Sequence, residues 1–281
     1  MQINPFTYVR TRRRAQSAVS GLGRSTLDFF RATGEGGVML GQVTRALFHR
    51  TDRPRREIIS TQLYHIGYLS LPVVLVTGAS MGMVMAVQSY ATLHRFNAEA
   101  MCGPMINYSV VSQIGPSMTA LLVAGRAGSN IAAELGTMKV TEQIDALRVM
   151  GTNPIKYLVA PRVLACTALM PVLGALAGVV GIFSGAFLCI AVWDVDQGAY
   201  WYQANKYVQK WDVFMGLAKC PFFGALIGIV SCRQGMMTGG GATGVGQSCT
   251  RAVVQASLLV LVMNFLLTLV SNELYDLFYG E

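Results

Sequence analysis

The stretch VLACTALMPVLGALAGVVGIFSGAFLCIAVW, residues Val163–Trp193, decides the fold because it contains no charged side chain. An α-helix needs roughly 20 predominantly apolar residues to cross the hydrocarbon layer of a bilayer. This stretch is longer than that, and it therefore predicts a membrane-spanning helix.

The whole chain has the composition of an integral membrane protein. Of its 281 residues, 53% are hydrophobic and 13% are charged, and the mean hydropathy is +0.45. These values are unusual for a soluble domain. Only one of the apolar stretches contains a charge, Lys219, and the alternation typical of membrane β-strands is missing. We predict an all-α membrane protein with five transmembrane helices, at about Ile66–Leu93, Ala100–Ala124, Val163–Trp193, Val213–Cys232 and Ala252–Asn272.

Basic residues alternate between the two sides of these predicted spans. Residues 1–60 hold eleven arginines and four acidic residues, and the loop 126–162 holds five basic and three acidic residues. The loop 194–212 has two lysines and three aspartates, and the charges after Asn272 are all acidic. Because basic loops stay in the cytoplasm, we expect a cytoplasmic N-terminus and a periplasmic C-terminus. The net charge of +8 follows from this asymmetry, so it does not indicate nucleic-acid binding.

The first 60 residues form a basic cytoplasmic segment by the same argument. An apolar signal-peptide core does not follow the basic start, so we expect the segment to be retained. Leu40, Val43 and Leu47 share one helical face, which is typical of an amphipathic helix lying in the membrane interface. A helix packed on the bundle would show the same pattern.

A charged block, GRAGSNIAAELGTMKVTEQIDALRVMG, occupies residues 125–151 between two apolar stretches. From Met138 to Met150 it has helical periodicity, with Ile144 and Leu147 on one face. Gly151 and Pro154 end this pattern. A short cytoplasmic amphipathic helix can bind a groove of a soluble partner, although it can also lie passively on the bilayer.

Small residues recur at every fourth position of the second predicted span and continue into the charged block. Helices in lipid associate through such residues because they allow the backbones to approach closely. The pattern predicts a packing stripe along one helix face, formed by Pro116, Ala120, Ala124, Gly128, Ala132 and Gly136.

Two motifs resemble parts of enzymes but lie in the wrong context. GASMG, residues 78–82, matches the nucleophile elbow of hydrolases, yet it falls within a predicted span and not in a strand–turn–helix. GATGVGQS, residues 241–248, lacks the lysine of a phosphate-binding loop and is expected to be a flexible connection. The six cysteines and three histidines show no metal-ligand spacing. We therefore expect a protein without catalytic activity, cofactor or metal.

Family resemblance adds a specific function to this outline. The charged block, NPIKYLVAPR at 153–162 and GGGATGVGQSCTRAVV at 239–254 together resemble the MlaE family of ABC transporter permeases over roughly residues 60–272. The resemblance implies a permease domain at 61–281 that pairs with a second permease chain, a cytoplasmic ABC ATPase and an MCE-domain protein. It also implies movement of phospholipids or related lipids between membranes, with ATP hydrolysed by the separate subunit. The alternative function is a membrane scaffold that tethers a cytoplasmic partner.

The resemblance also places the helix that contacts the ATPase at about 137–150. We expect ATPase coupling to involve Glu134, Lys139, Glu142, Ile144, Asp145, Leu147 and Arg148.

Lys219 is the strongest candidate for contact with a lipid. A cation at the centre of a spanning helix costs roughly 3 kcal/mol or more, so its side chain should face a cavity or a partner. An internal hydrogen bond or an extension of the side chain to the interface would also satisfy it. Many MlaE-family members have an Arg-Glu pair where this chain has Ser112-Gln113. The full set of predicted lipid-binding residues is Lys219, Gln113, Gln88, Tyr90, Asn107 and Tyr108.

Overall fold

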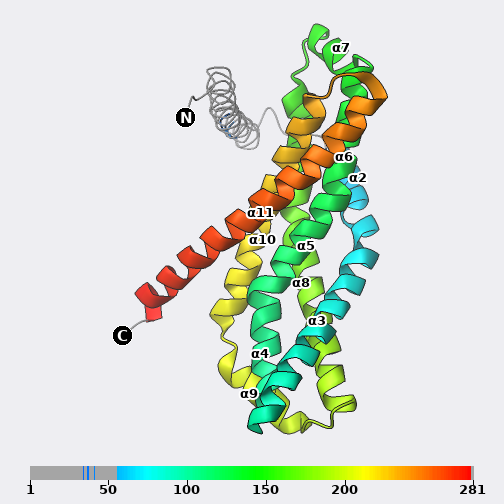
Figure 1. Ribbon diagram of the computed structural model, residues 1–281. Helices are drawn as coiled ribbons and strands as arrows, with labels where there is room; N and C mark the ends of the chain where they lie inside the picture. The colour runs from blue at the N-terminus through cyan, green and yellow to red at the C-terminus, as the bar shows by residue number, and fades with distance from the viewer. Residues whose placement is uncertain (1–33, 35–36, 38–40, 42–55, 280–281) are drawn as a thin grey trace, which may run out of the picture.

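The computed structural model describes residues 34, 37, 41 and 56–279 of the chain. Within these residues all regular structure is helical, and the helices form an elongated bundle (Figure 1). The predicted interfacial helix near residues 40–47 lies outside the described residues, apart from Gly41. So does nearly all of the predicted N-terminal segment 1–60.

Four helices of the described part are long and apolar enough to cross a membrane: Ile59–Phe96, Ile155–Ala191, Lys210–Met236 and Gly241–Leu277. The first combines α2 (Arg56–Ile66) and α3 (Leu71–Leu93), linked by the short η2 (Tyr68–Ser70). The second contains α8 (Ala160–Ala191), and the others correspond to α10 (Lys210–Met236) and α11 (Gly241–Tyr279). These four coincide with four of the five predicted spans.

The remaining predicted span, Ala100–Ala124, is helical but not uniformly apolar. It is built from α4 (Cys102–Ser109), the π-helical segment η5 (Val110–Ile114) and α5 (Gly115–Val123), and a second π-helical segment, η6 (Ala124–Gly128), leads into α6 (Ser129–Val140). Polar residues such as Asn107 and Gln113 lower its hydropathy. The count of five spans therefore stays a prediction.

Helices α3 and α8 pack at very short range through glycines. A Cβ atom added at Gly82 would lie 1.9 Å from the carbonyl oxygen of Gly181 and 2.5 Å from Ser184 Oγ. The predicted stripe of small residues, which runs along α5, η6 and α6, is confirmed as a packing surface, because all six of its residues are buried. At Gly136 the close neighbour is Thr238, which belongs to the segment after α10.

The bundle has two different ends, which Figure 1 shows at the top and the bottom. The short helix α7 (Gln143–Val149) lies at one end, between α6 and α8. Helix α9 (Gln197–Tyr207) lies at the other, where Asp196 Oδ2 accepts a hydrogen bond from the backbone N–H of Ala199 at 2.6 Å. Tyr200 of α9 is fully buried, and burial raises the pKa of its hydroxyl.

Two predictions of local structure, a flexible connection at 241–248 and a continuous helix at 137–150, are wrong. The glycine-rich segment 241–248 is not a flexible connection, because it forms the first turns of α11. The turn is confined to its start, where Gly240 and Gly241 have φ of 81° and 71°. The predicted amphipathic helix 137–150 is also not continuous. It breaks after Val140, and Glu142 adopts a left-handed conformation with φ of 59° before α7 begins.

Candidate functional site

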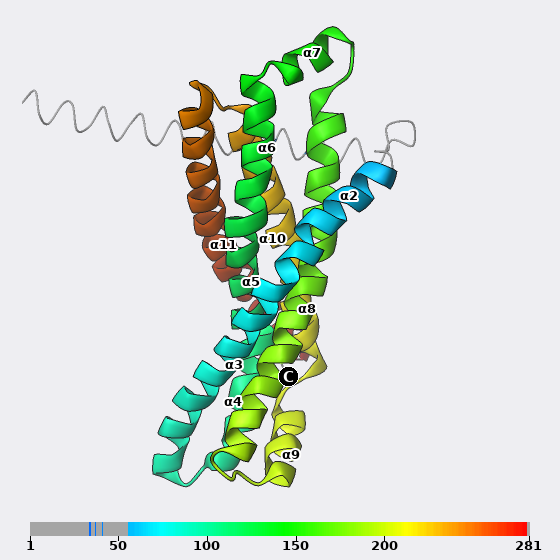
Figure 2. The same ribbon diagram turned by 90° about the vertical axis from the view of Figure 1, so that its right-hand side faces the viewer.

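The break between α6 and α7 changes the direction of the chain, so that α7 lies across one end of the bundle (Figure 2). Thr141 Oγ1 donates a hydrogen bond to the carbonyl oxygen of Thr137 at 2.9 Å, which occupies one acceptor at the end of α6. Gly151, with φ of 74°, then reverses the chain after α7. We call α6, α7 and the start of α8 the α6–α7 hairpin.

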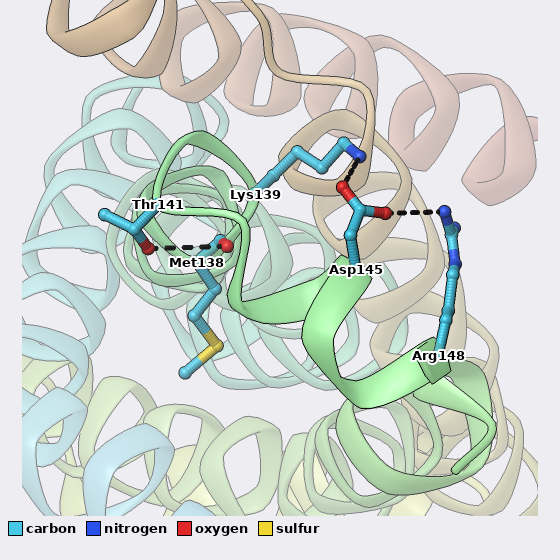
Figure 3. A network of polar contacts seen from close by, with 5 residues as sticks. All are labelled: Met138, Lys139, Thr141, Asp145 and Arg148. Carbon is cyan, nitrogen blue, oxygen red and sulfur yellow. Dashed lines mark hydrogen bonds and ion pairs between the residues drawn. The ribbon is translucent and has the colours of Figure 1, made fainter. Parts of the chain in front are cut away.

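Two ion pairs meet on one carboxylate of the hairpin, and one of them links α6 to α7 (Figure 3). Lys139 Nζ lies 2.7 Å from Asp145 Oδ2, and an Arg148 guanidinium nitrogen lies 2.9 Å from Asp145 Oδ1. The hydrogen bond from Lys139, together with the positive charges of Lys139 and Arg148, lowers the pKa of Asp145. Three of the predicted coupling residues are therefore brought together. The Lys139–Asp145 pair joins α6 to α7, whereas the Asp145–Arg148 pair lies within α7.

The apolar side chains of α7 divide between the core and the surface. Ile144 is fully buried in the main hydrophobic core, and Leu147 is partly buried against it. These two residues therefore anchor α7 to its own chain, and Ile144 offers no surface to a partner in this structure. The exposed apolar side chains are Val149 and Met150, at 90% and 69% exposure. The sequence pattern does not indicate them, because they lie outside the apolar face formed by Ile144 and Leu147.

A further ion pair closes the base of the hairpin. Glu134 Oε2 on α6 lies 3.1 Å from a guanidinium nitrogen of Arg162 on α8, whose side chain is only 6% exposed. Arg162 also donates to the carbonyl oxygen of Leu158 at 2.9 Å. The segment from Glu134 to Arg162 is thus closed into a loop by the ion pair between its first and last residues. Arg162 was not a predicted site residue, since nothing local in the sequence links it to Glu134.

Lys219 lies at a second polar centre, inside the bundle. The residue is 4% exposed, and Nζ donates to the carbonyl oxygen of Ser112 at 3.2 Å and to Thr268 Oγ1 at 3.0 Å. The single proton of Thr268 Oγ1 has two acceptors within reach, the carbonyl oxygen of Asn264 at 2.7 Å and Gln113 Oε1 at 3.1 Å. Of the alternatives raised by the sequence, the structure contains the internal hydrogen bond. All of these partners are neutral, so within the described residues the ammonium forms no ion pair.

The other predicted lipid-binding residues lie apart from this network. Gln88 is exposed on α3, whereas Tyr90 stacks on Trp193 with ring centroids 4.4 Å apart. On α4, Asn107 is buried and Tyr108 is 45% exposed. The structure therefore brings together Lys219 and Gln113 from the predicted set, and adds Thr268.

The fold and its two polar centres define a class of protein: a helical membrane protein with several spans, a charged hairpin at one end and a buried cation between helices. Comparison with known sequences gives the family. The family described as Permease MlaE matches residues 59–270, which is most of the chain. The chain therefore belongs to the MlaE permease family.

Individual relatives cover most of the chain. A probable ABC transporter permease protein of Rickettsia typhi is 44% identical over 211 residues, which is 75% of this chain and 82% of the relative. The intermembrane phospholipid transport system permease protein MlaE of Haemophilus influenzae is 36% identical over 252 residues, 89% of this chain and 95% of the relative. The chloroplastic protein TRIGALACTOSYLDIACYLGLYCEROL 1 of Arabidopsis thaliana is 38% identical over 207 residues, 74% of this chain and 59% of the relative.

Proposed function

We propose that this chain is the membrane-spanning subunit of an ABC transporter that moves phospholipids between membranes. The observation that carries the proposal is its 36% identity, over 89% of its length, to a permease of an intermembrane phospholipid transport system. The chain hydrolyses nothing itself. A separate cytoplasmic ATPase supplies the energy, and an MCE-domain protein exchanges lipid with the permease.

The subunit lies in the inner membrane, with the α7 end in the cytoplasm and the C-terminus in the periplasm. The basic residues of the hairpin and of residues 1–60 support this orientation. A second permease chain, identical or paralogous, completes the lipid path.

The ATPase contacts the α6–α7 hairpin. Val149 and Met150 supply an exposed apolar surface, and Arg148, at 55% side-chain exposure, lies beside them. The Lys139–Asp145 ion pair and the buried Ile144 make the hairpin stiff enough to transmit a movement of the ATPase to α6 and α8. A hairpin without these side-chain contacts would bend and would not transmit the movement.

The variant Val149→Asp with Met150→Asp tests this contact. We expect the permease to fold and insert normally, because both side chains are exposed, but to lose the ATPase during purification and to stop transporting lipid. Tyr202→Asp is the matched control, since Tyr202 is 68% exposed on α9 at the opposite end of the bundle. A scaffold would bind the ATPase without transporting lipid. The coupling role would be refuted if the variant lost the ATPase but the lipid content of the outer membrane stayed normal.

Lys219 attracts the phosphate of the transported lipid when the helices around it separate. A buried ammonium with only neutral partners is poorly compensated, and an entering phosphate would supply the missing charge. Thr268, which already accepts a hydrogen bond from Lys219, and Gln113 beside Thr268 would donate or accept further hydrogen bonds. Lys219→Met keeps the length of the side chain and removes the charge. We expect it to lower phospholipid binding in the assembled transporter while ATPase association is unchanged, and equal lipid binding by the variant would contradict this role.

A further inference from the structure

A groove of about 580 Å³ lies on the face of the bundle formed by α2, α6 and α11. Figure 2 shows α6 between the other two helices, with α11 on one side and α2 on the other. Residues of α6 and of the preceding η6 supply most of the lining, Gln62 and His65 come from α2, and Cys249 comes from α11. The Lys219 network has no residue in this lining, so the groove is a separate feature.

Arg126 is the cation of the groove, and most of its hydrogen-bonding capacity is unused. One guanidinium nitrogen donates to Ser70 Oγ at 3.0 Å. A guanidinium has five N–H donors, and in the described part of the chain no carboxylate forms an ion pair with this one. The groove also contains Glu134, but Arg162 and Asn130 already bind its carboxylate at 3.1 and 3.0 Å. The uncompensated charge of the groove is therefore positive.

Exposed tyrosines place the groove at the surface of the bilayer. Tyr64 and Tyr68, at 55% and 61% exposure, stack on each other with ring centroids 5.2 Å apart near the start of the span Ile59–Phe96. Tyrosines gather at the level of the lipid headgroups, where the ring is apolar and the hydroxyl is hydrated. The groove is lined by the same turns of α2 and η2, so it lies at headgroup depth.

The groove also continues into an apolar surface. Leu69, which lines the groove, lies on one helical face with Val73 and Val76 of α3, and these three side chains are 40%, 44% and 67% exposed. Acyl chains can follow this row into the hydrocarbon layer while a headgroup stays beside Arg126.

From this arrangement we propose that the groove binds a phospholipid of the surrounding leaflet, with its phosphate on the guanidinium of Arg126. Arginine matches the geometry of a phosphate, and the pairing is strong where water is partly excluded. Gln62 and His65 line the same groove and offer further hydrogen bonds from α2. A bound phosphate would thus connect α2 to η6 and α6. The proposal does not depend on the transport role, because a resident lipid would occupy the site in either case.

Cys249 provides a natural reporter, because it lines the groove and the other five cysteines of the chain are buried. The experiment measures the rate at which a water-soluble maleimide modifies Cys249 in the purified full chain in detergent micelles. Three additions are compared: phosphatidylglycerol, diacylglycerol, which lacks the phosphate, and glycerol 3-phosphate, which lacks the acyl chains. Cys249→Ser identifies the labelled thiol.

We expect phosphatidylglycerol alone to slow the labelling of the wild-type protein. In Arg126→Gln the lipid concentration needed for half-maximal protection should rise about tenfold or more, because a charge-assisted contact is lost. Arg126→Lys should restore part of the protection. Arg251→Gln is the matched control, since Arg251 is exposed on α11 two residues from the thiol, and it should behave like wild type.

Each other outcome overturns the proposal. Equal protection by diacylglycerol would mean that the phosphate is not recognised, and equal protection by glycerol 3-phosphate would mean a site for a soluble phosphate. Protection that needs no lipid and grows with protein concentration would mean that a second copy covers the groove. If Arg126→Gln fails to fold, the three additions to the wild-type protein still decide between these occupants.

Discussion

At the scale of single residues, the loss of the Glu134–Arg162 ion pair should destabilise the hairpin. Removing the Glu134 carboxylate leaves the guanidinium of Arg162, a residue that is only 5% exposed, without its ion-pair partner. An unpaired buried charge destabilises by about 3–5 kcal/mol, and the partial exposure of Glu134 reduces this to about 2 kcal/mol. We expect Glu134→Ala to lower the thermal unfolding midpoint of the purified permease.

Glu273→Ala is the control for that measurement, because Glu273 is an exposed acidic residue of α11. It should leave the midpoint within error of wild type. An unchanged midpoint in Glu134→Ala would mean that Arg162 finds water or another acceptor, and the tie between α6 and α8 would then be weaker than its geometry indicates.

Asp145 makes the hairpin sensitive to acid. Its pKa is lower in the folded protein than in the unfolded chain, chiefly because of the hydrogen bond from Lys139. The stabilisation is therefore present above the usual aspartate pKa and is lost as the pH falls through the folded-state value. Hydrogen–deuterium exchange of residues 143–149, corrected for the intrinsic rate at each pH, should show protection that declines only in this acidic range. Asp145→Asn should lack that decline, and an identical pH profile in the variant would exclude Asp145 as its source.

Long-range partners of a residue leave no signal in the local sequence. Lys219 could be singled out because a charge in an apolar span is rare. Its partners could not, since Thr268 is 49 residues away and Ser112 is 107 residues away. Periodicity correctly placed Ile144 and Leu147 on one face, but it could not tell whether that face meets a partner or the chain's own core.

At the scale of helices, apolar length was the reliable signal. The stretches Val163–Trp193 and Val213–Cys232 predicted α8 and α10 to within a few residues at each end. The start of α11 was missed because glycine clusters usually indicate loops, although glycine has no steric barrier to a helix. The break at Thr141–Glu142 was missed because a left-handed glutamate leaves no trace in the spacing of apolar residues.

The contact between α3 and α8 yields a prediction at this scale. Gly82→Ala places a methyl group against the backbone oxygen of Gly181, which cannot rotate away as a flexible side chain would. Overpacking of this kind costs about 1–3 kcal/mol, and we expect the upper part of that range. Gly246→Ala is the matched control in α11, where nothing lies within 4 Å of the added Cβ. Detergent-solubilised Gly82→Ala should unfold at lower temperature than wild type, whereas Gly246→Ala should not. If Gly82→Ala lowered the unfolding temperature only slightly, α3 and α8 would have to separate easily to make room for the methyl group.

At the scale of the whole molecule, α11 differs from the other long helices. Only 11% of the residues in its most apolar window are buried, compared with 44% in the corresponding windows of α8 and α10. Figure 1 shows its C-terminal half leading away from the bundle. Lipid can cover such a surface, and so can a second permease chain. The proposed lipid path between two chains favours the second.

Cysteine cross-linking distinguishes these two environments. In a Cys249→Ser background the remaining native cysteines are buried, so an introduced cysteine reports on its own surroundings. Phe265 on α11 and Val76 on α3 are 62% and 67% exposed, which makes them a matched pair. If α11 faces a second copy, oxidation of native membranes should join Phe265→Cys chains into a covalent dimer and leave Val76→Cys chains as monomers. Cross-linking of Phe265→Cys to a different permease chain would indicate a paralogous partner. Equal and low cross-linking at both positions would place α11 against lipid, and the interface between two permease chains would then have to lie on another face of the bundle.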